Sequence, residues 1–140
     1  MEPRARNLFQ RFQDGDWEKL IKFAAVRSFS ADTVIFDFDN FEPAVYFVTS
    51  GSVLLAEQNP GALRETRRQL NAGSVFGLLT FFDGKPREMR ATALDTVETL
   101  VLTDVMLERL AAWEPRVALI VVKDLAEAMV TITRQYDRLI

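Results

Sequence analysis

The sequence contains no cysteine and no histidine among its 140 residues. Without cysteine there is no disulfide, no iron–sulfur cluster and no thiol nucleophile. Without histidine the commonest general base and the commonest transition-metal ligand are missing, which excludes Ser-His-Asp catalysis, typical zinc sites and haem held by His or Cys. These two absences remove the commonest catalytic and metal-binding side chains, and we expect a protein that is not an enzyme and that carries no metal or other cofactor.

Positive charge is also scarce. The chain has 17 Lys and Arg against 20 Asp and Glu, for a net charge of −3. Nucleic-acid binders more often have a basic surface, so no direct nucleic-acid partner is expected. No apolar run approaches the roughly 20 residues that span a bilayer, and the first residues lack the apolar stretch of a secretion signal. We therefore expect no membrane partner and a cytoplasmic location.

Hydrophobic periodicity divides the chain into three parts of a single domain, residues 1–140. Residues 1–26 have helical spacing. Residues 27–102 contain short β-branched and aromatic runs separated by turn residues, a pattern typical of a sandwich or barrel. Residues 103–140 return to helical spacing. The prediction is a mainly β fold, an antiparallel double-stranded β-helix (a jelly-roll-like β-roll), with N-terminal helices and a long C-terminal helix.

The N-terminal part predicts two helices. Leu8 and Phe12 lie at helical spacing in the first. Asp16 stands where a side chain can cap the second, over residues 17–25.

The C-terminal part predicts a helix capped by Thr103 or Asp104, followed by a long helix that begins at Pro115. The apolar residues of the long helix repeat with heptad spacing: Ala118, Val122, Leu125, Met129, Ile132, Tyr136 and Leu139. Such a seam predicts a homodimer through Ala118–Leu139. The alternative is a stripe that packs on the protein's own barrel.

Three strings stand in order along the chain: RSFSADTVIF at 27–36, AVYFVTSGSV at 44–53 and LNAGSVFG at 70–77. They resemble the opening strands, the central Tyr-Phe-Val-x-Ser-Gly-x-Val hairpin and the start of the phosphate-binding cassette of the cyclic-nucleotide-binding domain family, as in catabolite-activator-type sensor domains. The resemblance implies a regulatory sensor with this β-roll fold. Transcription regulators of the family carry a helix-turn-helix after the long helix. This sequence stops at Ile140, so it is either a fragment or acts without its own DNA reader.

The segment that resembles the cassette runs from Phe76 to Glu88. In the family, backbone N–H groups and one Arg bind the cyclic phosphate, a Glu accepts from the ribose hydroxyl, and Ser or Thr follows the Arg. Gly77 and Arg87 match this pattern, whereas Leu78 replaces the Glu and Glu88 replaces the Ser or Thr. The lost acceptor costs about 1.5–3 kcal/mol, and a carboxylate near a phosphate costs roughly 1–4 kcal/mol. We expect weak or absent binding of cyclic AMP and cyclic GMP.

The resemblance implies these ligand-binding candidates: Phe76, Gly77, Leu78, Leu79, Arg87, Glu88 and Thr131. Arg87 either binds phosphate or forms a salt bridge with Glu88 or another surface acid. Thr131 and Thr133 lie near where the family's long helix reaches the base, although such threonines are usually plain surface residues. The ligand is a cyclic nucleotide or another small anion. The alternative function is a dimerising protein-interaction scaffold with a vestigial pocket.

Two further motifs predict no chemistry. Residues 34–39 imitate the first motif of haloacid-dehalogenase-type phosphatases, in which Asp37 would be the nucleophile and Asp39 the general acid. Those enzymes need an α/β sheet, whereas strands follow here, so a β-turn with solvated carboxylates is the better interpretation and the phosphatase a remote alternative. The basic run at 64–68 is interpreted as a solvated hairpin strand.

Overall fold

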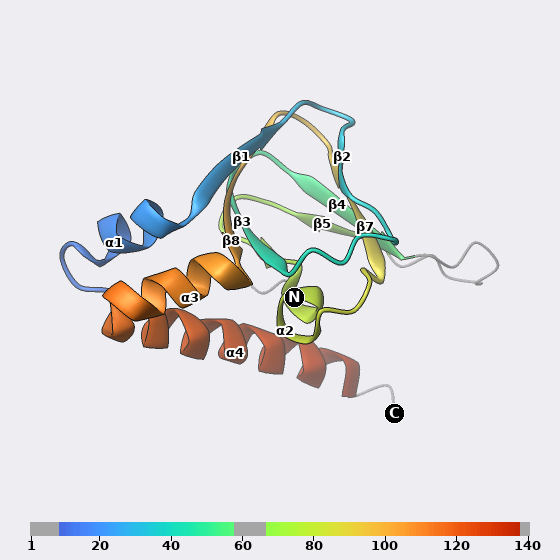
Figure 1. The fold of residues 1–140 in the computed structure, drawn as a ribbon. Coiled ribbons are helices and arrows are strands. Elements are labelled where there is room, and N and C mark those ends of the chain that lie inside the picture. Colours follow the sequence, from blue (N-terminus) through green and yellow to red (C-terminus); the bar gives the residue numbers. More distant parts are fainter. Residues whose placement is uncertain (1–8, 58–66, 138–140) are drawn as a thin grey trace.

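The computed structural model describes residues 9–57 and 67–137, with side chains through Arg134. Two four-stranded antiparallel sheets face each other and form a β-roll, with helices at both ends of the chain (Figure 1). The first sheet has the order β1-β8-β3-β6, with bounds β1 (Ala25–Phe29), β8 (Val97–Thr103), β3 (Ala44–Ser50) and β6 (Val75–Phe76). The second has the order β2-β7-β4-β5, with bounds β2 (Val34–Phe36), β7 (Met89–Ala93), β4 (Val53–Glu57) and β5 (Arg67–Leu70). The helices are α1 (Asp16–Phe23), α2 (Leu78–Asp83), α3 (Asp104–Trp113) and α4 (Pro115–Asp137). The predicted β-roll with a long C-terminal helix is confirmed.

Strand β3 is buried on both faces because its alternating side chains enter two different cores. Tyr46 and Val48 point between the two sheets, into what we call the roll core. Val45 and Phe47 point the other way, into the helical core under α1, α3 and α4. Each such side chain stabilises the fold by about 1.5–3 kcal/mol. The roll and the helices therefore form one body.

The first predicted helix is not formed in the described part of the chain. Residues 9–12 make a turn in which the N–H of Phe12 donates to the carbonyl of Phe9 at 3.0 Å, and Phe9 has a φ of 64°. Leu8 lies outside the described residues. The N–H of Phe9 donates to the buried carboxylate of Asp124 on α4 at 2.5 Å, and its ring is buried in the helical core. These tertiary contacts outweigh the weak helix propensity of the segment.

Asp16 begins α1 but does not cap it. Its buried carboxylate accepts hydrogen bonds from the N–H of Gln13 at 2.7 Å and from the guanidinium of Arg116 on α4 at 2.5 Å. The pKa of Asp16 is lowered, mainly by the hydrogen bond from Gln13. The carboxylate thus ties α1 to α4, a role that its place in the sequence did not reveal.

The predicted helix starts at the C-terminal end are confirmed. The hydroxyl of Thr103 accepts from the N–H of Met106 at 3.2 Å and caps α3. Pro115 is the first residue of α4, where its missing N–H costs no helical hydrogen bond. Among the described residues, none of the helices has the length and apolar character needed to cross a membrane.

The predicted heptad seam of α4 does not lie on one free face. Ala118 and Leu125 are buried in the helical core of the same chain, with Leu125 0% exposed. Met129 and Ile132 are partly buried against that core. Two seam positions lie beyond the described side chains: Tyr136 and Leu139. The core of the chain itself therefore takes up four of the five seam positions whose side chains are described.

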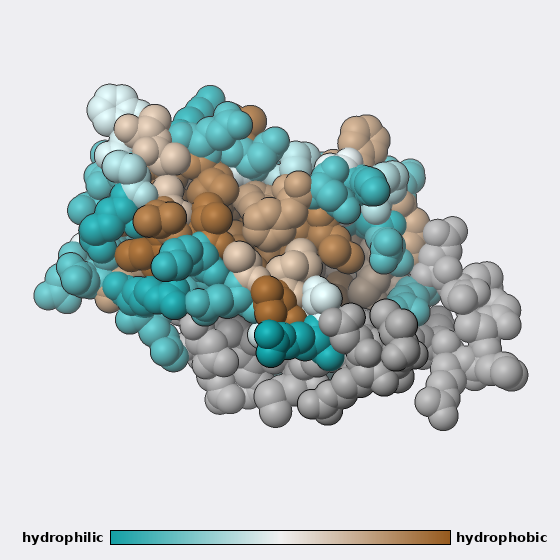
Figure 2. Space-filling model, turned by 90° about the horizontal axis from the view of Figure 1, so that it is seen from below, coloured by the Kyte–Doolittle hydropathy of each residue, from teal (hydrophilic) through white to brown (hydrophobic). Residues whose placement is uncertain are grey.

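The apolar residues of α4 that face solvent form what we call the α4 stripe, which shares only Val122 with the predicted seam among the described side chains: Leu119, Val122, Ala126 and Val130. Their spacing of three and four residues places them on one side of the helix. Figure 2, seen from below, shows hydrophobic surface gathered across this helical side of the molecule.

Truncating a buried residue of α4 should lower the free energy of unfolding far more than truncating an exposed one. Leu125→Ala should lower the free energy of unfolding by about 2–5 kcal/mol, because it leaves a cavity in the core. Val122→Ala, one turn away and 36% exposed, should change it by less than about 0.5 kcal/mol. Urea unfolding at low protein concentration measures both. Equal losses would contradict the assignment of the two helix faces.

Candidate ligand-binding site

A cavity of about 610 Å³ lies between the second sheet, α2 and the C-terminal half of α4. Small-molecule sites commonly have volumes of roughly 300–1,000 Å³. Its walls are mainly apolar and include Phe36, Leu55, Leu70, Leu78, Met129 and Ile132. Four charged residues line it as well: Glu57, Arg68, Arg87 and Glu88. The cavity has the size and character of a site for a small amphipathic molecule.

The fold brings most of the predicted ligand-binding residues to this cavity. Six of the seven line it: Phe76, Gly77, Leu78, Leu79, Arg87 and Glu88. Thr131 is not among the lining residues, because it is exposed and its hydroxyl donates to the carbonyl of Glu127 at 3.0 Å. Ile132 and Thr133 line the cavity in its place. Successive helical side chains point about 100° apart, so a small error in position selects the wrong face.

Gly77 joins β6 to α2 in a conformation that glycine favours. Its φ is 87°, and an added Cβ would lie 2.9 Å from Nη1 of Arg87 and 3.0 Å from the carbonyl oxygen of Ala44. Glycine therefore allows the cassette to pack closely against the start of β3.

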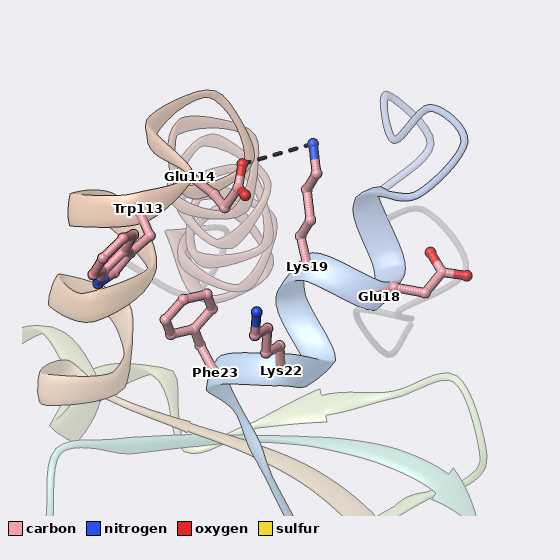
Figure 3. Close-up of a pocket in the computed structure, with 6 residues that line it drawn as sticks. All are labelled: Glu18, Lys19, Lys22, Phe23, Trp113 and Glu114. Carbon is pink, nitrogen blue, oxygen red and sulfur yellow. Dashed lines mark ion pairs between the residues drawn. The ribbon is translucent and has the colours of Figure 1, made fainter.

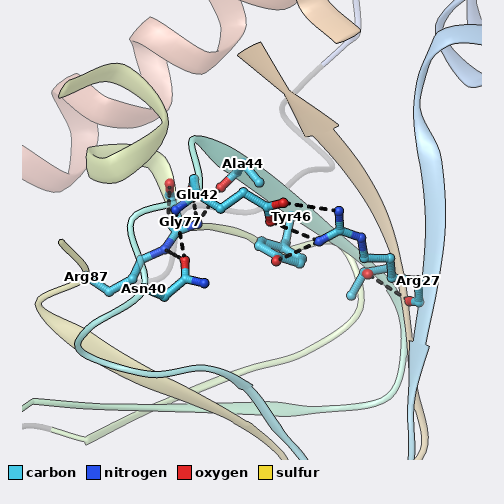
Figure 4. Close-up of polar contacts among 8 residues, drawn as sticks. Arg27, Asn40, Glu42, Ala44, Tyr46, Gly77 and Arg87 are labelled. Carbon is cyan, nitrogen blue, oxygen red and sulfur yellow. Dashed lines mark hydrogen bonds and ion pairs between the residues drawn. The ribbon is translucent and has the colours of Figure 1, made fainter. Parts of the chain in front are cut away.

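Arg87 is only 5% exposed, and backbone carbonyls surround its guanidinium. Nη1 donates to the carbonyl of Gly77 at 2.9 Å, and Nη2 donates to those of Glu42 and Ala44, both at 2.9 Å (Figure 4). Nε donates to Oδ1 of Asn40 at 3.4 Å. Four of the five guanidinium N–H groups are thus in use. None of these acceptors is a carboxylate, so the predicted salt bridge with Glu88 or another acid is wrong.

A wider polar network surrounds Arg87. Its guanidinium lies 4.2 Å from the centre of the Phe36 ring, a cation–π contact. Burial lowers the pKa of Arg87, but a guanidinium stays charged in proteins. On the other side of Glu42, Arg27 pairs with its carboxylate at 3.0 Å and donates to the hydroxyl of Tyr46 at 3.3 Å. These contacts fasten the cassette to the start of β3, so Arg87 has a structural role in this conformation.

Leu78 and Glu88 depart from the family's pattern in different ways. Leu78 is buried in the helical core, where Phe81 from α2 and Leu125 from α4 also lie. Its side chain therefore packs α2 against α4. Glu88 is exposed and lines the cavity, so it adds negative charge beside Arg87.

The sequence analysis missed Arg68. Strand β5 alternates, so that Arg68 and Leu70 line the cavity while Arg67 and Gln69 are exposed. The interpretation of the basic run as a solvated strand is therefore wrong for Arg68. The sequence did contain a signal for this inward position. Arg68 stands two residues before the apolar Leu70, and residues two apart lie on the same face of a strand.

Asp37 lies in a turn rather than in a catalytic centre. The N–H of Asn40 donates to its carbonyl at 3.0 Å, as expected for a β-turn. Its carboxylate pairs with Nε of Arg90 at 3.0 Å, and this hydrogen bond is the main cause of its lowered pKa. Asp39 is exposed. Within residues 9–57 and 67–137, no group of three or more acidic side chains is placed to hold a metal ion.

A second depression, of about 470 Å³, lies between α1 and the junction of α3 with α4 (Figure 3). Lys19 pairs with Glu114 across it at 3.6 Å, and Trp113 stands at its edge, largely exposed. No cassette residue lines it. The larger cavity is the candidate site.

The structural role of Arg87 can be tested by removing its charge. Arg87→Met should lower the free energy of unfolding by at least about 3 kcal/mol, because three inward-facing carbonyls lose their donors. Arg90→Met, three residues further along in β7, removes a half-exposed ion pair with Asp37 and should cost less than about 1 kcal/mol. Urea unfolding of both variants checks this. Similar small losses would show that Arg87 does not hold the cassette.

The family model described as "Cyclic nucleotide-binding domain" matches residues 26–112. A cyclic nucleotide-gated potassium channel from Mesorhizobium japonicum is 28% identical over 111 residues. The match takes in 79% of this chain but only 29% of the channel.

Two solved structures show the same fold. A cyclic nucleotide-binding domain from Methylobacillus flagellatus matches with a TM-score of 0.82 and 21% identity, covering 94% of this chain and 74% of that one. The catabolite activator protein of Thermus thermophilus matches with a TM-score of 0.78 and 25% identity, covering 95% of this chain and 62% of that one. Since the family model covers more than half of its length, this chain belongs to the cyclic nucleotide-binding domain family.

Proposed function

We propose that this chain is a non-enzymatic sensor module that takes a small ligand in its cavity and binds cyclic AMP and cyclic GMP weakly or not at all. The observation that carries the proposal is the state of Arg87. Its guanidinium, which would have to hold the cyclic phosphate, already donates to three backbone carbonyls.

A phosphate would have to compete with these carbonyls for Arg87. Each hydrogen bond to a charged group contributes about 1.5–3 kcal/mol, and a buried carbonyl left unpaired costs a further 1–3 kcal/mol or so. A micromolar affinity amounts to only about 8 kcal/mol. Moving Arg87 onto a phosphate would therefore consume much of the binding energy.

Leu78 and Glu88 also oppose the binding of a cyclic nucleotide. Leu78 offers no acceptor for a ribose hydroxyl, and it is committed to packing α2 on α4. The carboxylate of Glu88 repels a phosphate. A ligand with a different distribution of charge suits this cavity better.

A route for transmission runs from the cavity to α4. Met129, Ile132 and Thr133 of α4 line the cavity directly. Met129 and Ile132 also pack against the helical core, which contains Leu78 and Phe81 of α2. A ligand that touches both the sheet and α4 stabilises one position of α4 over others.

The non-enzymatic part of the proposal is supported by the side chains that could have acted as catalysts. Asp37 is held by Arg90 in a turn and is not among the residues that line the cavity. The chain also has no histidine or cysteine.

A second candidate function is a dimerising scaffold, and the exposed α4 stripe favours it. Leu119 and Val130 are each at least half exposed in one chain. A second copy of α4 packed on this stripe would remove them from water. The predicted homodimer through α4 is retained in this form, with the stripe in place of the buried seam residues.

Cyclic nucleotides provide the first functional test. Cyclic AMP and cyclic GMP should bind no more tightly than the high-micromolar range in calorimetric titration. Glu88→Ser should strengthen binding about tenfold, because it removes a repelling carboxylate. Glu108→Ser, the same change on an exposed position of α3, should have no such effect. A sub-micromolar dissociation constant for the native chain would overturn the proposal of weak binding.

The scaffold proposal is tested by assembly. Light scattering at tens of micromolar should give a dimer for the native chain and a monomer for Val122→Glu, because the substitution places charge in an apolar interface. Thr131→Glu, exposed on another side of α4, should remain dimeric. A monomeric native chain would exclude the stripe as a dimer interface.

A further inference from the structure

We propose that the cavity takes an amphipathic acid, with one anionic group on an apolar ring system, and that Arg68 rather than Arg87 binds the anionic group. This inference rests on the proposed sensor function, since it names the ligand chemistry of the same cavity.

Arg68 is positioned to receive an anion. Arg68 on β5 lies opposite Leu55 on the neighbouring strand β4, and both residues line the cavity. The side chain is half-buried, and within the described parts of the chain its guanidinium has neither an ion pair nor a hydrogen bond. A positive charge that is partly withdrawn from water without a partner is unfavourable. A carboxylate would fit the guanidinium fork with two parallel hydrogen bonds.

The two arginines that line the cavity differ in whether their guanidinium N–H groups are free to bind a ligand. The guanidinium of Arg87 donates to backbone carbonyls, and these hydrogen bonds hold the cassette in place. Arg68 can turn toward a ligand without losing a hydrogen bond or an ion pair to the described residues. The fold therefore separates the structural cation from the one that is free to bind.

Two carboxylates limit how much negative charge the ligand can carry. Glu57 lies two residues beyond Leu55 on the same face of β4, diagonal to Arg68, and forms no ion pair with it in the described structure. Glu88 lines another part of the wall. Since repulsion falls with distance, one compact anionic group at Arg68 is tolerated, whereas several dispersed charges are not.

The other residues that line the cavity indicate the size and polarity of the non-anionic part of the ligand. Phe36, Leu70 and Met129 offer an apolar surface, and a volume of about 610 Å³ accommodates two fused rings. Thr80 is buried and also lines the cavity, and its hydroxyl has no hydrogen-bond partner among the described residues. Buried polar groups normally have a partner, so a polar group on the ligand would satisfy it.

The test uses naphthalene-1-carboxylate as the probe and its neutral carboxamide as the matched compound. The chain of residues 1–140, labelled with ¹³C at the methionine methyl groups, reports where each compound binds. Met89 and Met129 line the cavity, whereas Met106 packs against the helical core. We expect both compounds to shift Met89 and Met129 and to leave Met106 unchanged, with the acid bound at least about tenfold more tightly than the amide.

Four variants test which side chains make the cavity prefer the acid to the amide. Arg68→Gln should weaken binding of the acid about tenfold or more and leave the amide unchanged. Arg67→Gln removes the same charge from the outward face of β5 and should change affinity for the acid less than twofold. Glu57→Gln should strengthen binding of the acid about two- to threefold, because it removes repulsion. Arg68→Lys keeps the charge without the fork and should give an intermediate affinity.

The possible failures are distinguishable. Equal affinity of the acid for the native chain and for Arg68→Gln, with Met89 and Met129 still shifting, would overturn the role of Arg68 and leave the sensor function standing. An amide that binds as tightly as the acid would do the same. If neither compound shifts Met89 or Met129, both this inference and the ligand-sensor function fail, and the scaffold is favoured.

Discussion

Strand β3 has apolar side chains on both faces, and the packing of the roll and the packing of the helices both rely on this one strand. Tyr46 and Val48 help to fill the roll core, while Val45 and Phe47 help to fill the helical core. A strand that is buried on both sides cannot shift by one residue without exchanging these two sets of side chains. The double burial therefore sets the register of the first sheet, and with it the distance between the sheets and α4. The cavity lies in the space that this arrangement leaves open.

The same strand explains the unusual state of the cassette. Ala44 begins β3, and its carbonyl is one of the acceptors that hold Arg87. Gly77 provides a second carbonyl and allows the close approach because it has no Cβ. The residue that matches the family's phosphate ligand is thus part of the support of the cavity. Any ligand must find its charged contact elsewhere or break this support.

The candidate site was predictable where it depends on local sequence. The resemblance around Gly77 and Arg87 located the segment that forms one wall of the cavity, and Gly77 has the positive φ that a tight connection needs. The contacts of Arg87 were not predictable, because its acceptors are backbone carbonyls, which every residue carries. Arg68 was misjudged for a related reason. A charged run looks solvated in sequence, and only the pairing of β5 with β4 shows which of its side chains turns inward.

The sequence by itself determined the class of fold, the change from strands to C-terminal helices and the two helix starts at Thr103 and Pro115, because turn residues, caps and periodicity act over a few neighbours. The tertiary structure decided which face each element buries. Leu125 belongs to an apparent dimer seam in sequence, but the chain's own core covers it. Asp16 looks like a helix cap, yet its partner Arg116 lies 100 residues away. Burial and long-range pairing depend on what the chain brings close in space, and spacing along the sequence does not contain that information.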